Sequence, residues 1–157
     1  MPKEIEYKFL LKNDEWRNNL ISSVFISQAY IKTAGARSVV RIRIVDSAQG
    51  LLTVKGNSNG ASRDEYEYQI PLSEAREMME RLCDAGPVLK TRNYVKYSGH
   101  LWAIDVFDGD NCGLVVAEIE LNSENEDFVK PPWLGQNITD DCRYSNFALA
   151  VKPYKSW

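Results

Sequence analysis

Charged residues of like sign recur at alternate positions in several short segments of this chain. Glu4 and Glu6 flank a single apolar residue, and Glu118 and Glu120 repeat this spacing near the other end of the sequence. Residues two apart project from the same face of a β-strand, whereas their neighbours project from the opposite face. The pattern therefore predicts strands that have one charged face and one apolar face.

Basic residues follow the same rule, since Arg41 and Arg43 share one predicted strand face, as do Lys90 and Arg92. A solvated surface also alternates, and that explanation stays open, but exposed faces normally mix the two signs because like neighbours repel. At ~7 Å such a pair costs roughly 2 kcal/mol at an effective dielectric near 20. Divalent cations would neutralise the acidic pairs, and a multiply charged anion would neutralise the basic pairs.

Turn residues divide the chain into eight candidate strands with mostly hairpin connections. These strands span residues 3–11, 25–32, 38–46, 51–55, 63–70, 89–97, 101–107 and 114–121. Four helices are expected, at 13–22, at 73–85 with Ser73 as N-cap, from Ser123 to the prolines at 131–132, and from near Ser145 to Val151. This order predicts a mainly β chain (α+β) with an antiparallel core. Eight strands can close a barrel that holds one small ligand, and a β-sandwich is the competing arrangement.

A barrel with a charged interior would direct the apolar strand faces outward, where they need cover. The helices expected at 13–22, 73–85 and 145–151 would supply part of that cover. The partner in a homodimer would be another source. The barrel hypothesis therefore depends on apolar segments that lie outside the wall.

Composition indicates one globular domain, residues 1–157, with 26% charged and 44% hydrophobic residues. A formal net charge of -3 gives no indication of nucleic-acid or anionic-membrane binding, and no apolar run reaches transmembrane length. Cys83, Cys112 and Cys142 are odd in number and widely spaced, and His100 is the single histidine, which argues against a zinc site. We expect a reduced, cytoplasmic protein.

The first charged segment, Glu4-Ile5-Glu6-Tyr7-Lys8, has the form ExExK, and further short segments follow it in a set order. They are Gln28-Ala29-Tyr30, Arg41-Ile42-Arg43, Thr53-Val54-Lys55, Arg63-Asp64-Glu65-Tyr66-Glu67, Lys90-Thr91-Arg92, Ile104-Asp105-Val106-Phe107 and Glu118-Ile119-Glu120. This series resembles the CYTH superfamily, the triphosphate tunnel metalloenzymes, over nearly the whole chain. The tail at 131–146 is similar to that of the compact bacterial inorganic triphosphatases.

The resemblance implies an eight-stranded antiparallel barrel, open as a tunnel, that uses Mg²⁺ or Mn²⁺ to hydrolyse inorganic triphosphate to pyrophosphate and phosphate. It implies metal-site roles for Glu4, Glu6, Glu67, Asp105, Glu118 and Glu120. It implies phosphate binding by Lys8, Arg41, Arg43, Lys55, Arg63, Lys90, Arg92 and Arg143. Tyr30 and Lys55 match a catalytic tyrosine–lysine pair.

Other readings stay open at this point. The same fold would suit an adenylyl cyclase, a thiamine or nucleoside triphosphatase, or a polyphosphate-binding module without catalysis. Single residues also have simpler readings under any of these functions: Tyr30 only fills the barrel, Asp105 orients a lysine, Arg143 caps or tethers the last helix, and Glu65 pairs with an arginine. The intact acidic pairs favour an enzyme over a binding module.

Overall fold

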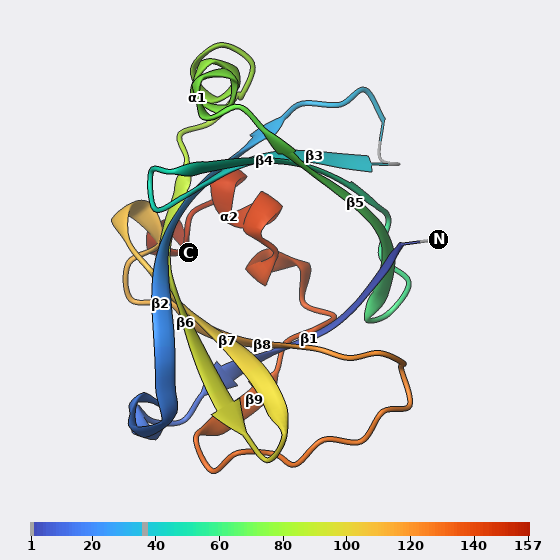
Figure 1. Ribbon diagram of the computed structural model, residues 1–157, viewed down its shortest axis with the longest axis vertical. Helices are drawn as coiled ribbons and strands as arrows, with labels where there is room; N and C mark the ends of the chain where they lie inside the picture. The colour runs from blue at the N-terminus through green and yellow to red at the C-terminus, as the bar shows by residue number, and fades with distance from the viewer. Residues whose placement is uncertain (1, 36–37) are drawn as a thin grey trace.

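The alternating segments form the wall of a closed antiparallel barrel in the computed structural model, which describes residues 2–35 and 38–157 (Figure 1). Its strands are β1 (Lys3–Leu11), β2 (Leu20–Ile31), β3 (Ser38–Val45), β4 (Gln49–Gly56), β5 (Ser62–Ile70), β6 (Val88–Tyr97), β7 (His100–Phe107) and β8 (Val115–Glu120). They follow the order β5-β4-β3-β2-β6-β7-β8-β1, and pairing of β1 with β5 closes the ring. The predicted mainly β barrel is confirmed, and the sandwich is excluded.

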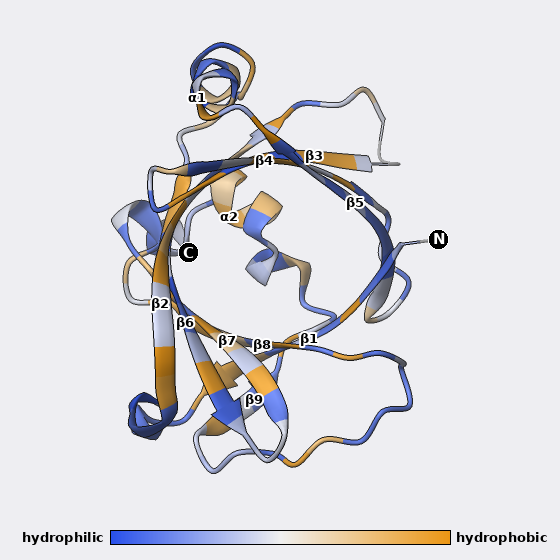
Figure 2. Cartoon of the chain, viewed as in Figure 1, coloured by the Kyte–Doolittle hydropathy of each residue, from blue (hydrophilic) through white to orange (hydrophobic). Residues whose placement is uncertain are grey.

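Strand register brings the charged positions together on the inner face of the wall. Glu6 lies opposite Glu120, and Lys8 lies opposite Glu118, because β1 and β8 run antiparallel. Figure 2 shows the corresponding alternation of hydrophilic and hydrophobic residues along the strands. The charged faces therefore point inward, as the like-signed pairs predicted.

Side chains from other segments of the chain cover the apolar outer face of β1, β7 and β8. Trp16, Trp102 and Trp133 are fully or almost fully buried there, in a cluster that also includes residues of β6. An additional short strand, β9 (Leu134–Asn137), pairs with the C-terminal half of β1 beyond the point where β5 leaves it. The sequence pattern does not predict β9, which lies in the tail segment at 131–146.

Helix α1 (Leu72–Arg81) packs on the outside of β3 and β4, as expected, although it ends four residues before the predicted boundary. It lies so close to the wall that a Cβ added at Gly50 would come within 2.8 Å of Ala75 Cβ. The short helix α2 (Asn146–Val151) begins where predicted, with the Ser145 hydroxyl accepting a hydrogen bond from Ala148 N.

Helix α2 does not cover the outer face, which corrects the expectation from sequence. Its Leu149 is fully buried with Val88, Phe107 and Val116, which lie on the same strand faces as the charged interior residues. In Figure 1 α2 is seen within the ring of strands. One end of the barrel interior is therefore packed with apolar side chains, and the other end is left hollow.

Two predicted helices are wrong. Residues 13–22 form only a 3₁₀ turn, η1 (Glu15–Asn19), because Leu20 already pairs with Val95 as the first residue of β2. Residues 123–131 form no helix, and the Glu126 carboxylate accepts a hydrogen bond from Asn122 N instead of capping a helical turn.

Three further 3₁₀ turns complete the described elements: η2 (Gly109–Asn111), η3 (Cys142–Tyr144) and η4 (Tyr154–Ser156). Within residues 2–35 and 38–157, no helix has the length and apolar character needed to cross a membrane.

Candidate active site

The hollow end of the barrel contains a cavity of about 660 Å³ whose lining is dominated by charged side chains. Its acidic lining consists of Glu4, Glu6, Glu65, Glu67, Glu118, Glu120, Asp140 and Asp141, and its basic lining of Lys8, Arg41, Arg43, Lys55, Arg63 and Arg92. Tyr30 also lines it, together with residues of the β4–β5 turn and of the segment that leads into α2. Most of the predicted site residues therefore meet in one space.

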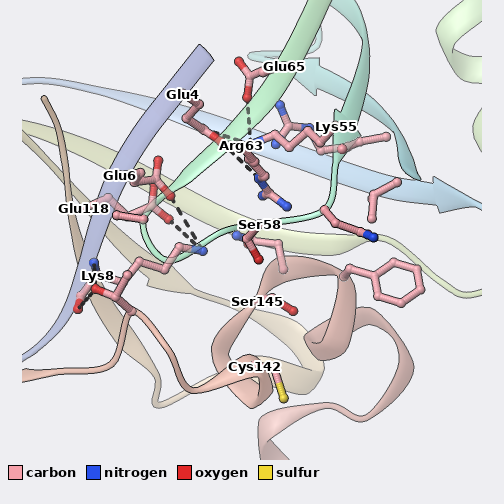
Figure 3. A pocket seen from close by; sticks show the side chains of 18 of the residues that line it. Glu4, Glu6, Lys8, Lys55, Ser58, Arg63, Glu65, Glu118, Cys142 and Ser145 are labelled. Carbon is pink, nitrogen blue, oxygen red and sulfur yellow. Dashed lines mark hydrogen bonds and ion pairs between the residues drawn. The ribbon is translucent and has the colours of Figure 1, made fainter. Parts of the chain in front are cut away.

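Glu4 is neutralised by two cations from neighbouring strands. Its carboxylate accepts hydrogen bonds from Lys55 Nζ at 2.9 and 3.0 Å and from Arg63 Nε at 3.2 Å (Figure 3). Burial acts to raise its pKa, but Lys55 and Arg63 outweigh burial and lower the pKa of Glu4 to about 2. Glu4 is thus ionised before any ligand binds.

Glu6 lies in the opposite situation, since its neighbour Glu118 carries the same charge. Burial and the Glu118 carboxylate together raise the pKa of Glu6 to about 8. Lys8 Nζ lies between the two carboxylates, at 3.8 Å from Glu6 and 3.6 Å from Glu118 (Figure 3). Here one ammonium offsets two carboxylates only in part.

The carboxylates on β1 and β8 suit a hard divalent cation, which prefers oxygen ligands. Glu120 adds a further carboxylate to this wall. Burial raises the pKa of Glu120, and the negative charges of Glu4 and Glu65 raise it further. Within the described part of the chain, no three acidic, histidine or cysteine side chains already enclose an ion site. A cation here would complete its shell with water and phosphate oxygens, as Mg²⁺ commonly does.

Two arginines on β3 carry positive charge that the protein compensates only in part, because Arg41 pairs with the Glu67 carboxylate at 3.3 Å and Arg43 has an amide partner. The Arg43 guanidinium donates to the Gln28 amide oxygen at 2.8 and 3.0 Å. Burial, with the positive charges of Arg41 and Arg92, lowers the pKa of Arg43 to about 10. Arg41 is 6% exposed, and its Nε is among the buried polar atoms of the described residues that have no hydrogen-bond partner. This part of the barrel, at β3, is therefore suited to binding an anion.

Two predicted site residues, Lys90 and Asp105, lie beneath the cavity and have no exposed side-chain surface. Asp105 accepts from Lys90 Nζ at 2.7 Å and from Arg92 Nε and Nη2 at 2.8 Å each. Lys90 also donates to Asn146 of α2 at 3.1 Å. Arg92 links these buried groups to the cavity, because its Nη2 also donates to the Glu118 carboxylate at 2.8 Å. The geometry agrees with Asp105 orienting cations, and any metal contact by Asp105 stays a prediction.

Tyr30 and Lys55 both line the cavity, but they have separate partners. Lys55 forms ion pairs with Glu4 and with Glu65, the latter at 2.8 Å. The Tyr30 hydroxyl accepts from Gln28 Nε2 at 3.0 Å, and its ring packs edge-on against Phe147 with centroids 5.5 Å apart. Burial raises the pKa of Tyr30. Each of these two residues therefore has partners of its own, and the catalytic pairing of Tyr30 with Lys55 stays a prediction.

Arg143 is the remaining predicted phosphate ligand, and it does not line the cavity itself, although its partner Asp141 and its neighbour Cys142 do. Its side chain is 63% exposed and donates to the Asp141 carboxylate at 2.7 Å. Its guanidinium also stacks on Tyr144 and Trp157, with 5.6 and 5.0 Å between the guanidinium carbon and the ring centroids. These contacts agree with the alternative role, in which Arg143 tethers the C-terminal segment.

A family model for the CYTH domain matches residues 2–152 of this chain. The chain belongs to the CYTH domain family. It is 45% identical over 157 residues to an inorganic triphosphatase of Acetivibrio thermocellus, which covers 100% of this chain and 99% of that protein. It is 35% identical over 151 residues to an inorganic triphosphatase of Nitrosomonas europaea, with 94% and 97% of the two chains covered. A crystal structure of an inorganic triphosphatase shares 34% identity, with a TM-score of 0.65 and 96% of each chain covered.

Gln28 and Thr53 are buried neutral residues of this CYTH domain that belong to the sequence motifs but had no predicted role. Gln28 holds Arg43 and Tyr30, and Thr53 accepts from Arg41 at 3.1 Å and donates to Glu67 at 2.9 Å. Thr53 lies on the same strand face as Lys55, and Gln28 on the same strand face as Tyr30, which was the available signal. Asn146 and Phe147 also reach the site, and only the folded C-terminal segment reveals them.

Proposed function

We propose that this CYTH protein hydrolyses inorganic triphosphate to pyrophosphate and phosphate with the help of Mg²⁺ or Mn²⁺. The observation that carries the proposal is that one cavity inside the barrel has an acidic wall and a basic wall. The negative charge at Glu6, where β1 pairs with β8, is only partly compensated by cations, and the positive charge of Arg43 on β3 is only partly compensated by anions. The two inorganic triphosphatases at 45% and 35% identity support the same activity.

The residues that would hold the divalent cation are the paired glutamates Glu4, Glu6, Glu118 and Glu120. The raised pKa of Glu6 is the observation that fits them to this task, because a nearby cation would favour its ionised form. When bound, such an ion supplies charge neutralisation for phosphate oxygens and orientation for an attacking water. The predicted contributions of Glu67 and Asp105 would be indirect, through Arg41 and Arg92, which they contact.

The chain's own cations would bind and align the substrate. Arg41 and Arg43 on β3 and Lys8 on β1 are anchored on strands of one closed sheet and line the same cavity, so their charges are positioned before the substrate arrives. Phosphoryl transfer depends mainly on in-line positioning and on neutralisation of the phosphate oxygens. Lys55 and Arg63 would exchange part of their contact with Glu4 for phosphate, and Tyr30 would contact the reacting group.

The location of the protein and its assembly remain proposals. The three cysteines are free thiols, in keeping with the reducing cytoplasm that we expect. A homodimer is proposed only as a source of further cover for the outer face.

Phosphate release from inorganic triphosphate, ATP and thiamine triphosphate, each with Mg²⁺ or Mn²⁺, tests the proposal. We expect the highest kcat/KM on inorganic triphosphate. Glu6→Gln keeps the side-chain shape but removes the charge, so it should abolish most of this activity. Glu124→Gln, at an exposed position between β8 and β9, should not. A preference for either organic triphosphate, or full activity of Glu6→Gln, would contradict the proposal.

A further inference from the structure

Gln28 links a cavity arginine to the cavity tyrosine although it is itself completely buried. It lies directly opposite Arg43 in the β2–β3 register and two residues before Tyr30 on the same strand face. Its amide oxygen accepts two hydrogen bonds from Arg43, and its amide nitrogen donates to the Tyr30 hydroxyl at 3.0 Å. Every polar atom of this amide therefore faces either the cation or the phenol.

The chemistry of the three groups determines the direction of these hydrogen bonds. A guanidinium can only donate, so the amide atom facing Arg43 must be the oxygen of Gln28. The NH₂ group then faces Tyr30, and since an amide nitrogen does not accept, the phenol oxygen must accept. The proton of Tyr30 is consequently directed away from Gln28. Among the described residues, no acceptor for that proton is found, and Tyr30 lines the cavity.

We propose that Gln28 is a positioning residue that fixes Tyr30 as a hydrogen-bond donor to a phosphoryl oxygen of the substrate. This inference rests on the proposed triphosphatase function and assigns a direction to Tyr30 within it. A chain of donation runs from Arg43 through Gln28 to Tyr30 and ends at the substrate. Because a cation starts the chain, each hydrogen bond polarises the next. The step is hydrogen bonding alone, so no proton is transferred to the substrate.

The protonated state of Tyr30 agrees with this role. Burial raises the pKa of its hydroxyl, even though Arg41, Arg43 and Lys8 face it with positive charge. A neutral phenol that accepts from an amide is a donor towards the cavity rather than a base. The role proposed for Gln28 thus differs from passive filling of the barrel, because it depends on which end of the amide meets Tyr30.

Gln28→Glu replaces the NH₂ donor that faces Tyr30 by a carboxylate oxygen acceptor, with almost no change in side-chain size. The carboxylate would still accept from Arg43, and would also accept the proton of Tyr30, which would turn away from the substrate. Removing a preorganised donor of this kind typically costs on the order of 10²-fold in rate. We expect kcat on inorganic triphosphate to fall by at least ~10-fold. KM should also rise, because the new carboxylate would offset part of the positive charge of Arg43, so kcat at saturating substrate is the readout for Tyr30.

Double-mutant kinetics separate this role from a structural one. If Gln28 acts through Tyr30, the Gln28→Glu/Tyr30→Phe protein should be no slower than Tyr30→Phe alone. Thr53→Val is the matched control, because Thr53 holds the neighbouring Arg41 and does not contact Tyr30. Its effect should persist in the Tyr30→Phe background. Additive effects for Gln28→Glu, or wild-type kcat in that variant, would overturn the inference.

Neutron diffraction from perdeuterated crystals provides a readout that is independent of activity. The deuteron on the Tyr30 hydroxyl should point into the cavity in the wild-type protein and towards residue 28 in Gln28→Glu. A wild-type deuteron that points at Gln28 would overturn the inference. If the wild-type protein released no phosphate from inorganic triphosphate, the proposed function would fail, and the neutron result alone would decide the direction of Tyr30.

Discussion

Replacing Asp105 by Asn tests the buried ionic layer beneath the cavity. Asp105 has no exposed surface and accepts one hydrogen bond from Lys90 at 2.7 Å and two from Arg92 at 2.8 Å. Asparagine keeps the shape but offers a single acceptor oxygen, and its NH₂ group would face a cationic donor. Two buried cations would then lose their shared counter-charge.

The expected loss is about 3–5 kcal/mol of unfolding free energy, which is the usual effect of removing one partner from a buried ion pair. That is a large share of the total of about 5–15 kcal/mol for a typical domain. Urea unfolding at neutral pH should show a midpoint lowered by roughly 2 M, given a slope near 2 kcal/mol per M. Asp141→Asn, which breaks the exposed pair with Arg143, should leave the midpoint unchanged within error.

The pH dependence supplies a second check on Asp105. Burial opposes ionisation, but Arg92 and Lys90 hold the pKa of Asp105 below its ordinary value of 3.8. A depressed pKa contributes stability above the unfolded value, and this stability is lost as pH falls through the folded value. The gap between wild-type and Asp105→Asn should therefore narrow below about pH 4. Near neutrality the gap should also vary with the ionisation of Lys90, because burial lowers the pKa of Lys90 to about 7 and Asp105 acts to raise it. A midpoint within error of wild-type at pH 7, or a gap that keeps widening below about pH 4, would refute the reasoning.

Three other expectations follow from the same structure. Phosphate release should vanish in excess EDTA and return with Mg²⁺ or Mn²⁺, and undiminished activity in chelator would remove the metal role of the paired glutamates. Arg41→Ala should weaken calorimetric binding of inorganic triphosphate by about 2–5 kcal/mol, because a desolvated cation is lost, whereas Arg76→Ala on the outside should not. Gly135→Ala should lower stability by about 1–3 kcal/mol, since the added Cβ would lie 2.7 Å from Leu10 O, and a fully stable variant would show that β9 can shift.

Strand patterns were predictable because they are local. Residues two apart share a strand face in any sheet, so the pairs at Glu4 and Glu6 and at Arg41 and Arg43 marked the inner face without knowledge of the fold. The helix at Ser145 was also predictable, because its cap lies within four residues of sequence. Such signals depend only on neighbours along the chain.

Short apolar runs were not decisive, because the same residues can satisfy two kinds of structure. Leu20 and Ile21 fit a helical spacing after Trp16, but pairing with β6 makes them the start of β2. The β9 segment has only four residues and a glycine, so nothing local distinguishes it from a loop. Its pairing exists because β1 extends past β5 and leaves an edge that β9 can satisfy.

By itself the sequence determined which side chains share a face, which signs they carry, and hence that the interior of the fold is ionic. Only the tertiary structure decided how these charges combine. Barrel closure joins Lys55 to Glu4, 51 positions apart, and packing of α2 leaves Lys90 and Asp105 beneath the cavity rather than in it. The physical reason is that the energy of a charge depends on its distance to other charges and on its access to water. Both quantities exist only once distant strands have met.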